Sequence, residues 1–190
     1  MSTRITLLAH AATAAQRHLR FPDNEGIEPL AAGVAGRVME QVGRSVLAWR
    51  GPERRAAETV DALGVSASPL TELRAWSMGA WTGRAVAEVA ERESDAFNSW
   101  RAGPDAAPHG GESLNGLLGR VGAWLEQPET AASRTLVVAD PAVIRAAIVC
   151  ALDAGSSTFW RVDIRPLSLA VLQRTDGTWR VRAMGVEQGG

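Results

Sequence analysis

Tyrosine is absent from this 190-residue sequence, and cysteine occurs only once. A single thiol, Cys150, cannot form an intramolecular disulfide bond. Because Cys150 lies within an apolar run, we expect it to pack as a small buried hydrophobic residue rather than act as a nucleophile. No apolar run approaches the ~20 residues that a bilayer-spanning helix needs, and the first ten residues lack the apolar region of a secretory signal. We therefore expect a cytoplasmic protein with no membrane partner.

An excess of charge of either sign is also missing, since 20 lysines and arginines face 21 aspartates and glutamates for a net charge of −1. Without a basic field the chain has no general attraction for nucleic acid, so we expect no nucleic-acid partner. The length suits one domain with a full core, and we expect a single domain over residues 1–190. The sequence does not indicate an oligomeric state.

Short apolar runs alternate along the chain with stretches in which apolar residues recur at helical spacing. The runs predict strands within residues 4–8, 45–49, 68–76, 135–139, 161–172 and 178–183. The other stretches predict helices over residues 30–42, 53–63, 85–100, 113–126 and 141–152, with residues 85–100 forming either one helix or two. This alternation is typical of a three-layer α/β/α fold around a mostly parallel central sheet, and Asp176-Gly177 predicts a turn between the last two strands.

Polar residues follow three of the predicted strands. His10 comes after the first, the segment from Gly51 to Arg55 after the second, and Asp140 after the third. Ligands of open α/β sheets bind beyond the carboxyl ends of the strands, so these residues mark the predicted site. Asp140 also precedes Pro141, and this pair is typical of a helix N-cap followed by a first-turn proline.

Tryptophan is frequent, with seven copies, whereas histidine occurs only three times. We expect Trp49, Trp124 and Trp179 to serve packing, and we consider Trp81 and Trp160 as candidates for lining a pocket. The histidines show no spacing typical of a metal site, so we expect no metal and no other cofactor.

Five segments in order resemble the motifs of the histidine phosphatase superfamily, the phosphoglycerate mutase-like proteins, over nearly the whole chain. They are Ala9-His10-Ala11 with Thr13, Gly51 to Thr59, Leu73 to Gly83, His109-Gly-Gly-Glu112-Ser113 and Val137 to Arg145. Within the superfamily the chain looks most like the small bacterial α-ribazole phosphatase-like group. The resemblance implies the phosphoglycerate mutase-like fold and a small-molecule ligand, phosphate esters included.

The resemblance also implies roles for individual residues. His10 stands where the family's nucleophilic histidine carries the phosphoryl group, and neutral imidazole is a competent nucleophile at pH 7. Arg55 stands where an arginine clamps the phosphoryl oxygens. Thr13, His109 and Glu112 fall in motifs around the substrate, and Asp140 takes the place of the family's second histidine.

Three positions depart from the family pattern. Ala9 replaces an arginine, Ala75 replaces the acid that protonates the leaving group, and Asp140 replaces a histidine. Loss of one charge-stabilising donor commonly costs about 10²–10³ in rate, and loss of a general acid about 10²–10⁴. A carboxylate ~4 Å from a phosphoryl oxygen adds repulsion of roughly 4 kcal/mol at an effective dielectric constant of 20.

These departures leave three hypotheses open. The first is a catalytically impaired protein that keeps a ligand pocket. The second is a working phosphomonoesterase with a phospho-His10 intermediate, in which His109 or Arg145 replaces a lost cation or Asp140 serves as the acid after burial raises its pKa. The third is a different enzyme, in which Asp140 orients His10 as an acid–base dyad.

Overall fold

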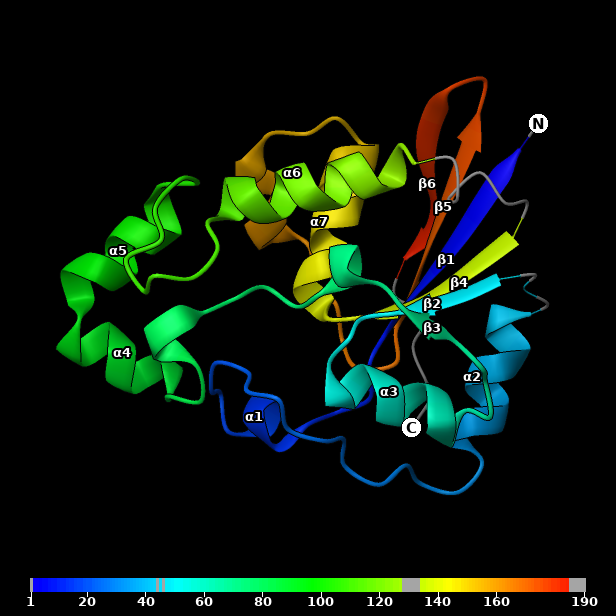
Figure 1. The fold of residues 1–190 in the computed structure, drawn as a ribbon, viewed down its shortest axis with the longest axis horizontal. Helices are drawn as coiled ribbons and strands as arrows, with labels where there is room; N and C mark the ends of the chain where they lie inside the picture. Colours follow the sequence, from blue (N-terminus) through cyan, green and yellow to red (C-terminus); the bar gives the residue numbers. More distant parts are fainter. Residues whose placement is uncertain (1, 44, 46, 128–133, 185–190) are drawn as a thin grey trace.

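A computed structural model describes residues 2–43, 45, 47–127 and 134–184 of the chain, and Figure 1 shows their arrangement. The strands are β1 (Thr3–Ala9), β2 (Leu47–Arg50), β3 (Ser68–Pro69), β4 (Arg134–Ala139), β5 (Leu169–Thr175) and β6 (Thr178–Met184). The α-helices are α1 (Ala14–Arg17), α2 (Val34–Val42), α3 (Arg54–Ala62), α4 (Val86–Arg92), α5 (Ser94–Ala102), α6 (Leu114–Leu125) and α7 (Pro141–Ala151).

The strands form one sheet in the order β3-β2-β4-β1-β5-β6. β1, β2, β3 and β4 are mutually parallel, while β5 runs antiparallel to β1 and β6 antiparallel to β5. The predicted α/β fold with a mostly parallel sheet is therefore confirmed. None of the helices within the described ranges is long and apolar enough to cross a bilayer.

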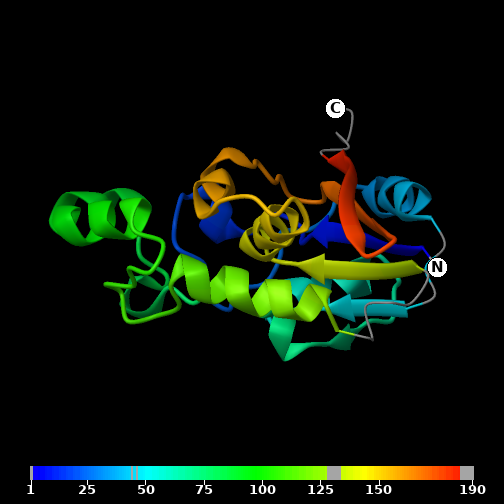
Figure 2. The same cartoon turned by 90° about the horizontal axis from the view of Figure 1, so that it is seen from above.

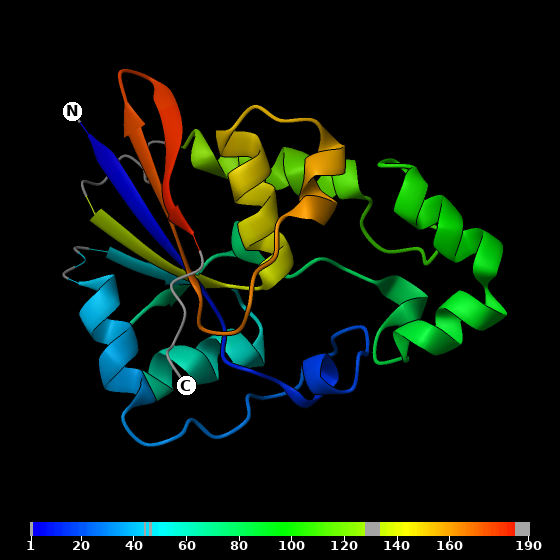
Figure 3. The same cartoon turned by 180° about the vertical axis from the view of Figure 1, so that it is seen from behind.

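Helices cover both faces of the sheet, as Figures 1 and 2 show: α6 and α7 lie on one face, and α2 and α3 on the other. Each face carries its own apolar cluster. Leu117 and Ile144 belong to the cluster under α6 and α7, whereas Val38 and Val60 belong to the one under α2 and α3. Buried strands with apolar residues on both faces are what a parallel sheet requires. The helices α4 and α5 extend beyond the sheet, which Figure 3 shows from behind.

Several predicted boundaries differ from the structure. The strand expected over residues 161–172 begins only at Leu169: Arg161 ends a 3-10 helix, and residues 162–168 form turns and irregular structure. The helical segment expected over residues 85–100 as one helix or two forms two helices that meet at Glu93, whose carboxylate accepts a hydrogen bond from the indole of Trp81. The turn between the last two strands is confirmed: Asp176 and Gly177 both have positive φ, the type I′ geometry of a two-residue hairpin.

Gly79 lies where two loops approach each other closely. Its φ is +48°, and a Cβ atom there would lie 2.1 Å from the carbonyl oxygen of His109. We expect Gly79→Ala to lower the free energy of unfolding by about 1–3 kcal/mol, the range for a strained backbone conformation. Gly119→Ala is the matched control, because a Cβ on that helical glycine meets nothing within 4 Å and alanine favours a helix by about 1 kcal/mol. Urea denaturation measures both, and equal stabilities would contradict the expectation.

Candidate functional site at the strand ends

The register of the parallel strands brings the predicted polar residues together. Ala9 of β1 pairs with Ala139 of β4, so the next residues, His10 and Asp140, leave the sheet side by side. β2 pairs with β4 on its other side, and the helix α3 that follows it carries Arg55 in its first turn. All three side chains are almost fully buried.

The His10 ring is held in a defined orientation. Its Nδ1 lies 2.7 Å from the carbonyl oxygen of Ala11, and because a carbonyl only accepts, Nδ1 donates to it. Nε2 then faces the Asp140 carboxylate at 3.6 Å, which is longer than a hydrogen bond. In a dyad with Asp140 at Nε2, Nδ1 would have to act as the base, and Nδ1 instead faces the Ala11 carbonyl oxygen. This contact disfavours the third hypothesis.

Arg55 is already engaged by the protein. Its guanidinium donates to the backbone oxygen of Asp23 at 2.6 Å and to Oδ2 of Asp140 at 3.0 Å. Glu25 lies 4.0 Å from the same guanidinium. Thr59 holds the helix start in place: its hydroxyl donates to the Arg55 carbonyl oxygen and accepts the Ala11 N–H. The family's phosphoryl-clamping arginine is thus present but paired.

Asp140 remains ionised in this environment. Burial acts to raise its pKa, but the interaction with His10, the positive charge of Arg55 and the hydrogen bond from the Ala142 N–H together hold the pKa well below its usual range. The same carboxylate caps α7 through that N–H. The prediction that burial raises the pKa of Asp140 enough to make it a leaving-group acid is therefore wrong.

A cavity of about 210 Å³ opens in front of His10. Thr13, Arg55 and Asp140 line it, so four of the six predicted site residues meet there. Thr13 also forms a capping box with Gln16 at the start of α1, which fixes this part of the wall. The other lining residues are mainly apolar and aromatic.

His109 and Glu112 do not line this cavity. The His109 ring packs against Trp81 and Trp100 and accepts the Gly111 N–H at Nδ1. Burial lowers the pKa of His109, so the ring is neutral at pH 7 and does not replace a lost cation. Glu112 instead receives two hydrogen bonds from Arg120. Both positions favour structural roles over the predicted contact with substrate.

Of the two tryptophans considered as pocket residues, one lines the cavity and the other does not. Trp160 lines the cavity, as expected for a pocket residue. Trp81 is fully buried, and its indole donates to Glu93 rather than lining the cavity.

Sequence reasoning missed two charged side chains near the site, Glu25 and Glu53, and considered a third, Arg145, only as a replacement for a lost cation. Glu25 and Arg145 both line the cavity, and each has a buried polar atom without a hydrogen-bond partner among the described residues. Glu53 accepts the Ala75 N–H at 2.6 Å, which places a carboxylate beside the position where the family motif carries its acid. Glu53, Arg55 and Ala75 line a second cavity of about 400 Å³. Arg145 closes the last matched motif, and the second hypothesis named it as a candidate replacement for a lost cation.

No cluster of three or more histidine, cysteine or acidic side chains that suits a metal ion occurs in the part of the chain that the structure describes.

This architecture, with a buried histidine and arginine at the ends of parallel strands, defines the class of α/β proteins related to phosphoglycerate mutase. The chain belongs to the histidine phosphatase superfamily (branch 1), whose family model matches residues 7–187.

Similar proteins agree with this assignment. A bifunctional protein of Mycobacterium tuberculosis is 28% identical over 192 residues, covering 95% of this chain and 53% of that protein. The chain thus spans about half the length of the curated relatives it matches. A mycobacterial glucosyl-3-phosphoglycerate phosphatase superposes with a TM-score of 0.81 at 21% identity, covering 98% of this chain and all of the other. The α-ribazole phosphatase of Shigella flexneri gives 0.79 at 16% identity, with 96% of each chain covered.

Replacing Asp140 with asparagine tests the buried ion pair. Asparagine retains an acceptor for the N-cap but leaves Arg55 without its partner carboxylate. Removing one member of a buried pair costs about 3 kcal/mol or more, and we expect a loss of about 3 kcal/mol in the free energy of unfolding at pH 7. Urea denaturation of both proteins measures this loss.

The pH dependence separates the charge from packing. The pKa of Asp140 in the folded chain lies below the ~3.9 of an unfolded aspartate. The stabilisation is therefore fully present above about pH 4 and is lost as the pH falls further. We expect the difference between wild type and Asp140→Asn to be large at about pH 5 and to shrink at about pH 3. A difference of the same size at both ends would contradict this explanation.

Proposed function

We propose that this chain is a ligand-binding member of the superfamily whose phosphoryl-transfer chemistry is impaired. The observation that carries the proposal is the position of the Asp140 carboxylate, 3.0 Å from the Arg55 guanidinium and 3.6 Å from Nε2 of His10. It lies between the nucleophile and the cation that a phosphoryl group has to contact. The pocket keeps room for a small molecule in front of His10.

Charge argues against efficient use of phosphate monoesters. A phosphoryl oxygen on Arg55 lies within ~4 Å of Asp140, where repulsion between unit charges is roughly 4 kcal/mol at an effective dielectric constant of 20. Arg55 also has fewer free donors, because Asp23 and Asp140 take two of its N–H groups. Ala9 and Ala75 supply neither the second arginine nor the acid. Each of these changes weakens the stabilisation of the transition state, but none of them removes the cavity.

Turnover of p-nitrophenyl phosphate tests this proposal, because its acidic leaving group needs no general acid. We expect a wild-type rate no higher than that of His10→Ala, and no phosphohistidine after incubation with the ester. Asp140→His, which restores the family residue, is expected to raise the rate by about 10²–10³, the equivalent of the roughly 4 kcal/mol of repulsion that it removes. A strong phosphohistidine signal in the wild type that disappears in His10→Ala would refute the proposal.

Glu53 favours one competing candidate, a phosphomonoesterase that works through a phospho-His10 intermediate. The carboxylate of Glu53 lies beside Ala75 and shares a cavity with Arg55, so it could supply the proton that the alanine cannot. The relative solved as a mycobacterial phosphatase with VO3 shows that this fold hosts such oxyanions in other proteins.

The leaving group distinguishes this candidate. If Glu53 is the acid, Glu53→Gln lowers kcat for an alkyl phosphate by about 10²–10⁴ and changes kcat for p-nitrophenyl phosphate little. His10→Ala then abolishes both activities. Steady-state kinetics on the two esters provides the measurement, and an equal effect of Glu53→Gln on both esters would exclude the role of Glu53.

A further inference from the structure

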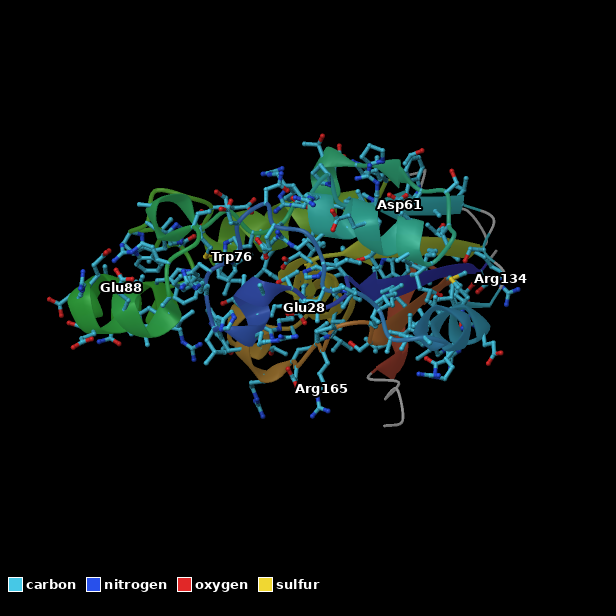
Figure 4. The ribbon with its side chains drawn as sticks, turned by 90° about the horizontal axis from the view of Figure 1, so that it is seen from below. Glu28, Asp61, Trp76, Glu88, Arg134 and Arg165 are labelled. Carbon is cyan, nitrogen blue, oxygen red and sulfur yellow. The ribbon has the colours of Figure 1, made fainter. Side chains whose placement is uncertain are left out.

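Part of the wall of the His10 cavity is mainly aromatic. Six apolar side chains form it: Phe21, Trp76, Met78, Trp100, Phe159 and Trp160. They come from segments far apart in the sequence, and Figure 4 shows Trp76 between the sheet region and the part of the chain that carries α4 and α5. A wall assembled from such distant segments depends on the whole fold.

The rings hold one another in place. Trp76 lies edge-on to Phe159 with ring centroids 5.4 Å apart, and Trp160 lies edge-on to Trp100 at 5.1 Å. The guanidinium of Arg101 covers Trp160 at 4.2 Å from the ring centroid. Rings fixed in this way provide an apolar surface that needs little ordering when a ligand binds.

Arg145 is the cation of this cavity whose guanidinium makes no hydrogen bond among the described residues. Its Nε is buried without a partner, its ion-pair carboxylate Asp163 lies 4.0 Å away and is 77% exposed, and its guanidinium carbon lies 5.8 Å from the centroid of the Phe159 ring. Burial lowers the pKa of Arg145, while the charges of Asp163 and Asp140 act to raise it. Arg20 also lines the cavity, but it is exposed to water.

The carboxylates limit how much negative charge the cavity accepts. Arg55 is paired with Asp140, and Glu25 lies near the same guanidinium. A single negative charge on a ligand is attracted by Arg145, whereas a second negative charge is repelled by Asp140 and Glu25. The planar guanidinium of arginine suits a carboxylate, which it binds through two parallel hydrogen bonds.

We propose that the cavity binds a small amphipathic monoanion, with a flat apolar body against Trp76, Phe159 and Trp160 and a carboxylate on Arg145. This inference rests on the proposed ligand-binding function and assigns the class of ligand.

Isothermal titration calorimetry at about pH 8 with three naphthalene probes tests the assignment. The probes are 2-naphthoate, a monoanion; 2-naphthyl phosphate, a dianion at this pH; and 2-naphthalenemethanol, which is neutral. We expect 2-naphthoate to bind at least about tenfold more tightly than either of the others. The shared ring system keeps the apolar contact constant, so the order reports the charge preference of the cavity.

Substitutions then locate the two contacts. Arg145→Gln is expected to weaken 2-naphthoate at least about tenfold and to leave the neutral probe unchanged, while Arg145→Lys retains most of the affinity. Trp160→Ala weakens all three probes. Arg92→Gln, which removes an exposed arginine of α4, is the matched control and changes none of them. Thermal melting of each variant shows that it is folded.

Tighter binding of the phosphate ester than of the carboxylate, no binding of any probe, or an unchanged affinity for 2-naphthoate in Arg145→Gln would each overturn the inference. Failure of the proposed function looks different, because it appears as His10-dependent hydrolysis of 2-naphthyl phosphate. That hydrolysis is measured in a separate assay, through the 2-naphthol that it releases.

Discussion

The ion pair between Arg55 and Asp140 connects the fold of this chain to its chemistry. It exists because two parallel strands end in register, so that Asp140 leaves β4 beside the residue that follows β1 while α3 brings Arg55 in from the next strand. Two charges buried together need good geometry and further hydrogen bonds to offset their desolvation. Further hydrogen bonds come from the Asp23 carbonyl oxygen for Arg55 and from the Ala142 N–H for Asp140, while Nε of Arg55 is buried without a partner among the described residues.

The same pair changes what the strand ends can bind. An arginine that binds a phosphoryl group has to pair its positive charge with the ligand. Arg55 instead pairs with the carboxylate of Asp140. His10 keeps an orientation that suits a nucleophile, with Nδ1 donating to a carbonyl and Nε2 directed outward, but Nε2 faces a carboxylate. The centre of the cavity is thereby nearly compensated in charge. Its remaining attraction for an anion lies at Arg145, next to the aromatic wall.

Much of this site could be predicted from the sequence. The positions of His10, Arg55 and Asp140 after successive apolar runs were sufficient to bring them to one edge of a parallel sheet. The spacing of the motifs did not place His109, because its ring direction depends on packing against Trp81 and Trp100. Burial alone also gives the wrong direction for the pKa of Asp140, since the partner charges outweigh desolvation only once the fold has assembled them.

The fold shows the same division between local and tertiary information. Ser113 and the Asp140-Pro141 pair marked helix starts that the structure confirms, because N-caps act locally. The short helix α1 was not predicted, since four residues give no periodicity to recognise. Glu53 was missed because its contact with Ala75 joins two segments that are distant in the sequence, and no sequence pattern indicates that they meet.

A crystal structure determined after soaking with vanadate tests the central claim most directly. Vanadate resembles a phosphoryl group in transfer, so it binds tightly only where His10 and Arg55 are both free to contact it. The ion pair predicts that Asp140 stays on Arg55 and that no ordered anion lies between Arg55 and Nε2 of His10. An ordered vanadate bonded to Nε2 and held by Arg55, with Asp140 displaced, would contradict the account.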